Sequence, residues 1–335
     1  MCRLEVTELE KVYGNKKQTK RAVQCLTAEF GHGVYGLLGE NGAGKTTLMR
    51  MIVGILKPTQ GQITCDGIPI GQLGGTYRNM LGYLPQDFGY YKEFSAVRFL
   101  NYIAALKAIS PHAAKVRIDR LLEMVGLTEE RNKKLKTFSG GMLRRIGIAQ
   151  ALLNEPKILI LDEPTAGLDP RERVRFRNII SALGKDRIVI LSTHIVSDVE
   201  YIADKILIMK HGQLIQSGTP VQILEPVAGC VWNCIVPVKT ADELNAAYAV
   251  SNLRNYTGSD HGKSQGEYTR SDLGKNQVEY TGNDRGKSQG EHIGSVQETG
   301  YGEWVELRIV SRKKPHPDAV AVEPVLEDAY LYYYI

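Results

Sequence analysis

Ser139-Gly140-Gly141-Met142 and Ile158-Leu159-Ile160-Leu161-Asp162-Glu163 are the two stretches that decide the fold of this chain. In the first, two glycines let the backbone approach a phosphate, and Ser139 adds a hydroxyl where a helix is expected to begin. Apolar residues at helical spacing follow, beginning with Leu143 and Ile146. A serine in this place is also typical of a simple helix N-cap. The stretch therefore predicts a helix whose N-terminus either binds an anion or is merely capped.

The second stretch combines a strand with a pair of acids. Its four consecutive apolar residues predict a strand buried on both faces of a parallel sheet. Asp162 and Glu163 follow at the carboxyl end of that strand, which is where open α/β sheets bind ligands. A buried strand that ends in acidic residues is common, so this stretch alone would not identify a site.

A glycine-rich loop lies upstream of both stretches. Residues 39–46, GENGAGKT, fit the pattern G-x-x-x-x-G-K-[ST]. An apolar run at 33–38 precedes them and a helical pattern follows from Thr46, which is the strand, loop and helix context that the motif requires. In that context backbone amides surround phosphate groups and Lys45 reaches the β and γ phosphates, whereas an isolated match would be only a glycine-rich turn.

Together and in this order, the three stretches resemble the Walker A, signature and Walker B motifs of the ATP-binding cassette (ABC) ATPases. The resemblance extends over residues 1 to about 225 and implies an α/β fold: a P-loop NTPase core, an antiparallel β subdomain and a helical subdomain that carries the signature. The sequence departs from the family at two signature positions, since Met142 stands where Gln is usual and Phe138 where Leu is usual. The Ser-Gly-Gly core is intact.

The resemblance assigns a role to each candidate site residue, with ATP and Mg²⁺ as the expected ligands. Glu163 would act as general base, with Gln86 and His194 as the other catalytic residues. Mg²⁺ would be held by Thr46, Gln86 and Asp162. The nucleotide would be bound by Gly39, Glu40, Asn41, Gly42, Ala43, Gly44, Lys45, Thr46 and Thr47, by Ser139, Gly140, Gly141 and Asp169, and by Tyr13 stacked on adenine.

Two of these residues have structural alternatives. A lone histidine at the end of a strand, such as His194, is more often a satisfied structural residue. Its place one strand after Glu163 favours the site instead. Tyr13, also at a strand end, could equally serve packing.

The composition is that of an ordinary globular protein. The chain has 335 residues, 43 per cent of them hydrophobic, and its net charge of +5 is not gathered into a basic arm, so nucleic acid is not expected as a partner. No apolar run approaches the ~20 residues that cross a bilayer. Five scattered cysteines favour reduced thiols buried in strands, with Cys230 and Cys234 on one face of a strand.

The chain divides by pattern near residue 225. Residues 1–225 are expected to form the ABC ATP-binding domain, with a hairpin at Asp66-Gly67 and a helical subdomain at about 90–138, where Ser95 and Pro111 can begin helices. Residues 226–335 form a small C-terminal accessory region. It contains 12-residue repeats at 256–303, whose polar and glycine-rich sequence is expected to be disordered, with a short β-hairpin array around the tyrosines as the alternative. The repeats lie between strand-like runs at 231–238 and 305–310 that could pair.

The resemblance implies an ATP-binding and hydrolysing subunit of an ABC transporter, with export favoured because residues 324–331, PVLEDAYL, resemble the tails of type-2 exporter subunits. Its expected partners are a membrane-spanning permease and a second ATPase subunit, a copy or a paralogue, arranged head to tail. It would then lie at the cytoplasmic face of the membrane, held there by the permease. The alternatives are an ABC ATPase acting on the ribosome or nucleic acid, and a nucleotide-gated regulator without a permease.

Overall fold

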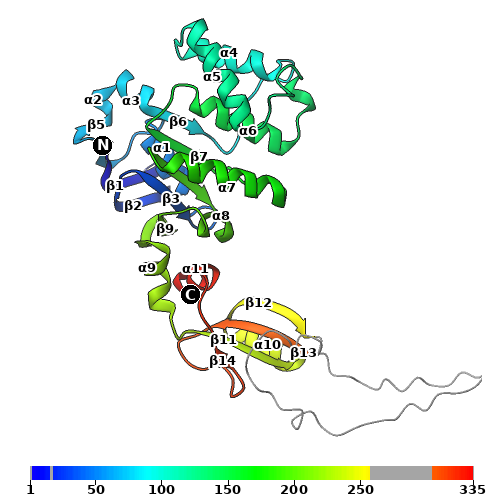
Figure 1. The fold of residues 1–335 in the computed structure, drawn as a ribbon. Coiled ribbons are helices and arrows are strands. Elements are labelled where there is room, and N and C mark those ends of the chain that lie inside the picture. The colour runs from blue at the N-terminus through cyan, green and yellow to red at the C-terminus, as the bar shows by residue number, and fades with distance from the viewer. Residues whose placement is uncertain (1, 16–17, 257–303, 335) are drawn as a thin grey trace, which may run out of the picture. The chain divides into compact units, whose positions relative to one another are not determined.

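The computed structural model describes residues 2–15, 18–256 and 304–334 (Figure 1). These residues form two compact units. Unit 1 comprises Met1–Cys230 together with Glu323–Ile335, and unit 2 comprises Val231–Val322. The repeats predicted to be disordered lie outside the described residues, except for Tyr256 at their start.

Unit 1 is built on a six-stranded sheet whose central strands are parallel. Its strands are β10 (Gln213–Gly218), β9 (Lys205–Lys210), β3 (Gly33–Leu38), β8 (Ile188–Thr193), β7 (Ile158–Asp162) and β6 (Leu81–Leu84), in that order, with only β10 antiparallel to its neighbour. Every residue of β3, β7 and β8 is buried, as expected for strands covered on both faces.

A second, antiparallel sheet completes the β structure of unit 1. Its strands are β2 (Gln18–Phe30), β1 (Leu4–Asn15), β4 (Gln60–Cys65) and β5 (Ile68–Pro69). The predicted hairpin at Asp66-Gly67 joins β4 to β5, and both residues have the positive φ, 50° and 79°, that such a two-residue turn needs. The α/β fold with an added antiparallel sheet is therefore confirmed.

The main core of unit 1 joins the two sheets through α1 (Lys45–Ile52). Leu48 and Met51 of α1 pack in the same buried cluster as Ile63 of β4 and Ile160 of β7. Full burial of one such side chain contributes about 1.5–3 kcal/mol. This packing fixes the start of α1, and with it the loop before the helix, against the end of the parallel sheet.

The helical subdomain begins each of its helices at a serine. Ser95 caps α4 (Ala96–Leu106), Ser110 caps α5 (Pro111–Met124) and Ser139 caps α6 (Gly140–Leu152), each accepting a hydrogen bond from a backbone amide three residues later. The helices predicted to follow Ser95 and to begin at Pro111 are thus confirmed. Further helices of unit 1 are α2 (Ile70–Leu73), α3 (Gly75–Met80), α7 (Pro170–Gly184), α8 (Val196–Glu200), α9 (Pro220–Leu224) and α11 (Leu326–Tyr334).

Unit 2 is a small antiparallel sheet with one helix. The strand order is β12 (Ala249–Tyr256), β13 (Trp304–Val310), β11 (Val231–Pro237) and β14 (Val320–Ala321), and the predicted pairing of β11 with β13 is confirmed. Alternate residues of β13, such as Leu307, pack in a core with Cys234 and with Leu244 of α10 (Val238–Ala247). Among the described residues, no helix of either unit combines the length and apolar character needed to cross a bilayer.

Candidate active site

The glycine-rich loop ends where α1 begins, at the carboxyl end of β3. Gly44 is the N-cap of α1 and has a φ of 105°, with no side chain bonded to the helix amides. An added Cβ at Gly44 would lie 2.3 Å from Ala22 O, so both the turn and the neighbouring strand require glycine. The uncapped N-terminus of α1 therefore presents free amides and the positive end of the helix dipole to an anion.

Lys45 is the cationic residue of this loop and is only 5 per cent exposed. Its Nζ donates hydrogen bonds to Gly39 O at 2.6 Å and to Glu40 O at 3.1 Å, and lies 3.6 Å from Glu163 Oε1. Burial lowers the pKa of Lys45, while the nearby Glu163 carboxylate acts in the opposite direction. A buried ammonium beside an open helix N-terminus is well suited to bind phosphate.

Asp162 is held at the end of β7 in an arrangement that fits a divalent cation. Its Oδ1 accepts hydrogen bonds from Thr46 Oγ1 at 3.1 Å and from Ser192 Oγ at 2.7 Å. Its Oδ2 is buried and has no hydrogen-bond partner among the described residues. An orphaned carboxylate oxygen beside a threonine hydroxyl is the oxygen donor set that Mg²⁺ prefers.

Glu163 and His194 meet although they follow different strands. Glu163 Oε2 lies 2.8 Å from His194 Nδ1, and the Glu163 amide donates to Ser192 Oγ at 2.9 Å. Glu163 is 5 per cent exposed and has a φ of 48°, a backbone strain that non-glycine residues adopt mainly at functional sites. The contact gives the carboxylate a fixed direction and a partner that can share its proton.

Tyr13 and Gln86 line one cavity with the glycine-rich loop. The cavity measures about 380 Å³, and its wall includes Tyr13, Gln86, Thr47 and Glu163 as well as the loop residues. Tyr13 is 40 per cent exposed at the edge of this space, where a ring could stack on a base. The structure thus brings Tyr13 and Gln86 to the same place as the glycine-rich loop and the Walker B acids.

The signature stretch does not line this cavity, although Gly140 lines a second one that shares Gln86 with it. Ser139 Oγ accepts a hydrogen bond from Met142 N at 3.2 Å, so the serine is a true N-cap, and its own exposure leaves it available to a ligand as well. Asp169 similarly caps α7, accepting from Glu172 N at 2.9 Å. None of the described residues that line the first cavity comes from the Ser-Gly-Gly stretch or is Asp169.

Ser192 is a site residue that the sequence analysis missed. It stands opposite Asp162 in the pairing of β7 with β8, and its hydroxyl bonds both to Asp162 and to the Glu163 amide. The signal was present in the sequence, because Ser192 is a polar residue at the end of an otherwise apolar strand. Its role is to fix both Walker B acids.

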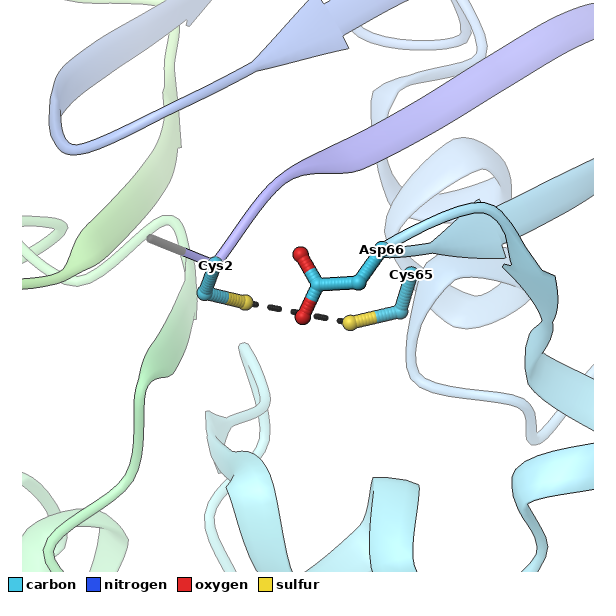
Figure 2. A group of neighbouring side chains, drawn as sticks. All are labelled: Cys2, Cys65 and Asp66. Carbon is cyan, nitrogen blue, oxygen red and sulfur yellow. Dashed lines mark hydrogen bonds between the residues drawn. The ribbon is translucent and has the colours of Figure 1, made fainter.

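The cysteines depart in part from the expectation of thiols buried in strands. Cys25 lies in β2 but is exposed, and Cys230 lies just before β11, so only Cys234 of that pair is in the strand. Figure 2 shows the sulfurs of Cys2 and Cys65 facing each other, 3.7 Å apart, with the Asp66 carboxylate alongside. Burial raises the pKa of Cys2, and that of Cys65 to about 12, so this pair stays protonated and packs as apolar side chains.

Comparison with known proteins agrees with this geometry. The sequence profile of the ABC transporter family matches residues 26–166. An uncharacterized ABC transporter ATP-binding protein of Synechocystis is 35 per cent identical over 79 per cent of this chain and 75 per cent of its own. The bacitracin transport ATP-binding protein BcrA of Bacillus licheniformis is 39 per cent identical over 64 per cent of this chain and 68 per cent of its own.

Solved structures give the same result. The structure described as an ATP-binding subunit of an ABC transporter covers 67 per cent of this chain and 92 per cent of its own, with a TM-score of 0.59 and 29 per cent identity. The cbiO1 subunit from Clostridium perfringens, part of the transporter complex cbiONQ, covers 66 and 90 per cent, with a TM-score of 0.57 and 30 per cent identity.

Proposed function

This chain belongs to the ABC transporter ATP-binding proteins, and we propose from that premise that it powers export through a separate membrane permease. As the ATP-binding subunit of an ABC transporter it hydrolyses ATP to ADP and phosphate. The direction of transport is supported by relatives whose names state it, such as the Nod factor export ATP-binding protein I of Rhizobium etli, which is 32 per cent identical over 69 per cent of this chain.

The observation that supports ATP hydrolysis as the source of this power is the meeting of Lys45, Asp162 and Glu163 beneath an open helix N-terminus. The free amides of α1 and Lys45 bind the phosphates, and Glu163 accepts the proton of the attacking water as general base. His194 orients Glu163 through the 2.8 Å contact. Asp162 and Thr46 would hold Mg²⁺, which neutralises phosphate charge, and Gln86 borders the same space.

A second ATPase subunit completes this site in the proposal. Ser139, Gly140 and Asp169 are exposed, and Gly141 is buried in the first turn of α6. None of these four residues lines the cavity of its own chain. Placed head to tail, a copy or paralogue would bring its signature to the phosphates bound here. Hydrolysis would then be coupled to closure of two subunits, which is the motion that a permease can use. The permease would also hold the protein at the cytoplasmic face of the membrane.

The shared site is tested by mixing two inactive variants. We expect Ser139→Arg to stop hydrolysis while ATP still binds, and Lys45→Ala to weaken binding itself, because only Lys45 belongs to the cavity of its own chain. Mixed dimers of the two should regain one working site. Ser110→Arg is the matched control, since Ser110 caps α5 in the same way but lies outside the motifs. Mixed dimers without any activity would contradict the shared site.

Export is tested with the membrane protein encoded beside this chain. Both are reconstituted in liposomes so that the ATPase faces outward, and ATP is added outside. We expect the permease to stimulate hydrolysis and a transported probe to accumulate inside, which corresponds to export from a cell. A rate of ATP hydrolysis that is the same with and without the membrane protein would favour the alternative of an ABC ATPase without a permease.

A further inference from the structure

Helix α11 belongs to the same unit as the nucleotide site, although nearly a hundred residues of unit 2 precede it in the chain. It packs against α8 and α9, and Leu326 and Ala329 on its inner face are fully buried. Asp328 Oδ2 accepts a hydrogen bond from Val325 N at 2.8 Å at the start of the helix. The helix is therefore a fixed part of unit 1.

The last described residue of α11, Tyr334, reaches the glycine-rich loop. Its hydroxyl accepts a hydrogen bond from Glu40 N at 3.1 Å and donates to Met209 O at the end of β9. Lys210 Nζ donates to Tyr334 O at 2.7 Å and lies 5.2 Å from the centre of the Tyr334 ring. The approach is close, because a Cβ added to Gly39 would lie 3.2 Å from the hydroxyl.

The peptide group between Gly39 and Glu40 is thus held at both ends. Its N–H donates to Tyr334 Oη, and its C=O accepts from Lys45 Nζ at 2.6 Å. The hydrogen bonds run in one direction, from Lys45 through the peptide and Tyr334 to Met209 O. Hydrogen bonds in such a chain polarise and strengthen one another.

We propose that Tyr334 is a positioning residue for ATP binding, acting through the Gly39–Glu40 peptide on Lys45. With the hydroxyl in place, the peptide is fixed and Lys45 is held at the mouth of the phosphate site before ATP arrives. Without it, the peptide loses a partner and the loop must be ordered at the expense of ATP affinity. The inference rests on ATP hydrolysis by this site.

The test is Tyr334→Phe, with Tyr333→Phe as its matched control. Tyr333 lies on the same helix and its hydroxyl also makes two hydrogen bonds, donating to Ile223 O at 3.2 Å and accepting from Gln216 Nε2 at 3.1 Å, but neither partner is in the loop. For Tyr334→Phe we expect the KM for ATP to rise about three- to tenfold, as for loss of one hydrogen bond, with kcat changed less than about twofold. Tyr333→Phe should leave both within about twofold of the parent.

Two further variants test whether the effect depends on the position of the Tyr334 hydroxyl and passes through Lys45. Lys210→Met keeps the hydroxyl but removes the side chain that holds Tyr334, and it should raise the KM less than Tyr334→Phe does. In the Lys45→Ala background, Tyr334→Phe should change ATP affinity no further, because its effect passes through Lys45. Equal KM values for Tyr334→Phe and Tyr333→Phe, or full additivity with Lys45→Ala, would overturn the proposal. An inactive parent enzyme would instead contradict the proposed function.

Discussion

The two units of this protein differ most in what they bury. In unit 2, every buried side chain among the described residues is apolar. Unit 1 buries charged and polar side chains as well: Lys45, Thr64, Arg145, Asp162, Glu163, Thr165, Ser192, Thr193, Asp198 and Asp328. Burying a charge costs free energy unless it is paired, so buried charges occur in structural ion pairs and hydrogen bonds as well as at sites of chemistry. In unit 1 both kinds are present: Lys45, Asp162 and Glu163 lie at the candidate site, whereas Arg145 and Asp328 are paired away from it.

The sheets of the two units explain how this difference arises. The fully buried strands β7 and β8 run parallel and end at the same edge, so Asp162 and Ser192 come to lie side by side there. In unit 2, β13 alternates between buried and more exposed residues up to Ile309 and runs antiparallel to both neighbours. Its strand ends are therefore divided between two edges, and among the described residues of unit 2 no charged side chain is buried.

The largest expected effect is that of a Glu-to-Gln substitution in unit 1, which is compared with the same substitution in unit 2. Glu163→Gln should lower kcat for ATP hydrolysis at least about 100-fold, because the amide keeps the shape of the side chain but cannot accept the proton. ATP binding should survive. Phosphate release and nucleotide binding are measured on the same preparation.

Glu306→Gln is the counterpart in unit 2. Glu306 bonds Asn233 and Arg254 on the neighbouring strands but lies in no motif. Its change to Gln should leave kcat and KM within about twofold of the parent, as is usual for substitutions away from a site. A Glu163→Gln variant with parental turnover would remove Glu163 from the role of general base and would erase this distinction between the units.

A smaller effect is expected when a large side chain in the core of either unit is replaced by alanine. Leu307→Ala in unit 2 should cost about 2–5 kcal/mol of that unit's stability and leave ATP hydrolysis nearly unchanged. Both tryptophans of the chain, Trp232 and Trp304, lie in unit 2, so their fluorescence during denaturation follows this unit selectively.

Ile190→Ala in β8 gives the reverse test. Ile190 belongs to the main core of unit 1, so hydrolysis should become heat-sensitive while the tryptophan transition stays in place. If Leu307→Ala shifted the loss of activity and the tryptophan transition together, the two units would unfold as one, and the comparison would hold for function but not for stability.

The smallest effect concerns residues 257–303. Tyr256 at the end of β12 pairs with Trp304 at the start of β13, so a short turn can join the two strands directly. Replacing 257–303 by a four-residue Gly-Ser turn should leave kcat and KM unchanged. It should raise the stability of unit 2 by up to about 2 kcal/mol, because a shorter connection costs less loop-closure entropy. A fall in ATPase activity would show that the repeats take part in the function.

Local signals in the sequence were enough to predict much of unit 1. The serines before α4 and α6 bond to backbone amides only three residues later, and the glycine-rich loop is a similarly local pattern. A short stretch of sequence was therefore enough to predict where these helices begin and where the candidate site lies. Ser192 required knowing that β7 and β8 are neighbours. Tyr334 could not be found, because it contacts Glu40 across 294 residues and no local pattern encodes that approach. Cys25 was misjudged because a strand residue near an irregular pairing can turn outward.

The link between α6 and α7 has a mechanical consequence. Arg145 of α6 forms two contacts with the Glu172 carboxylate of α7, at 3.1 and 3.2 Å, and also donates to Val125 O at the end of α5. These contacts tie the helix that begins at the signature turn to the first turn of α7, which Asp169 caps. The two turns that the proposal places against a second subunit should therefore shift together when that subunit moves.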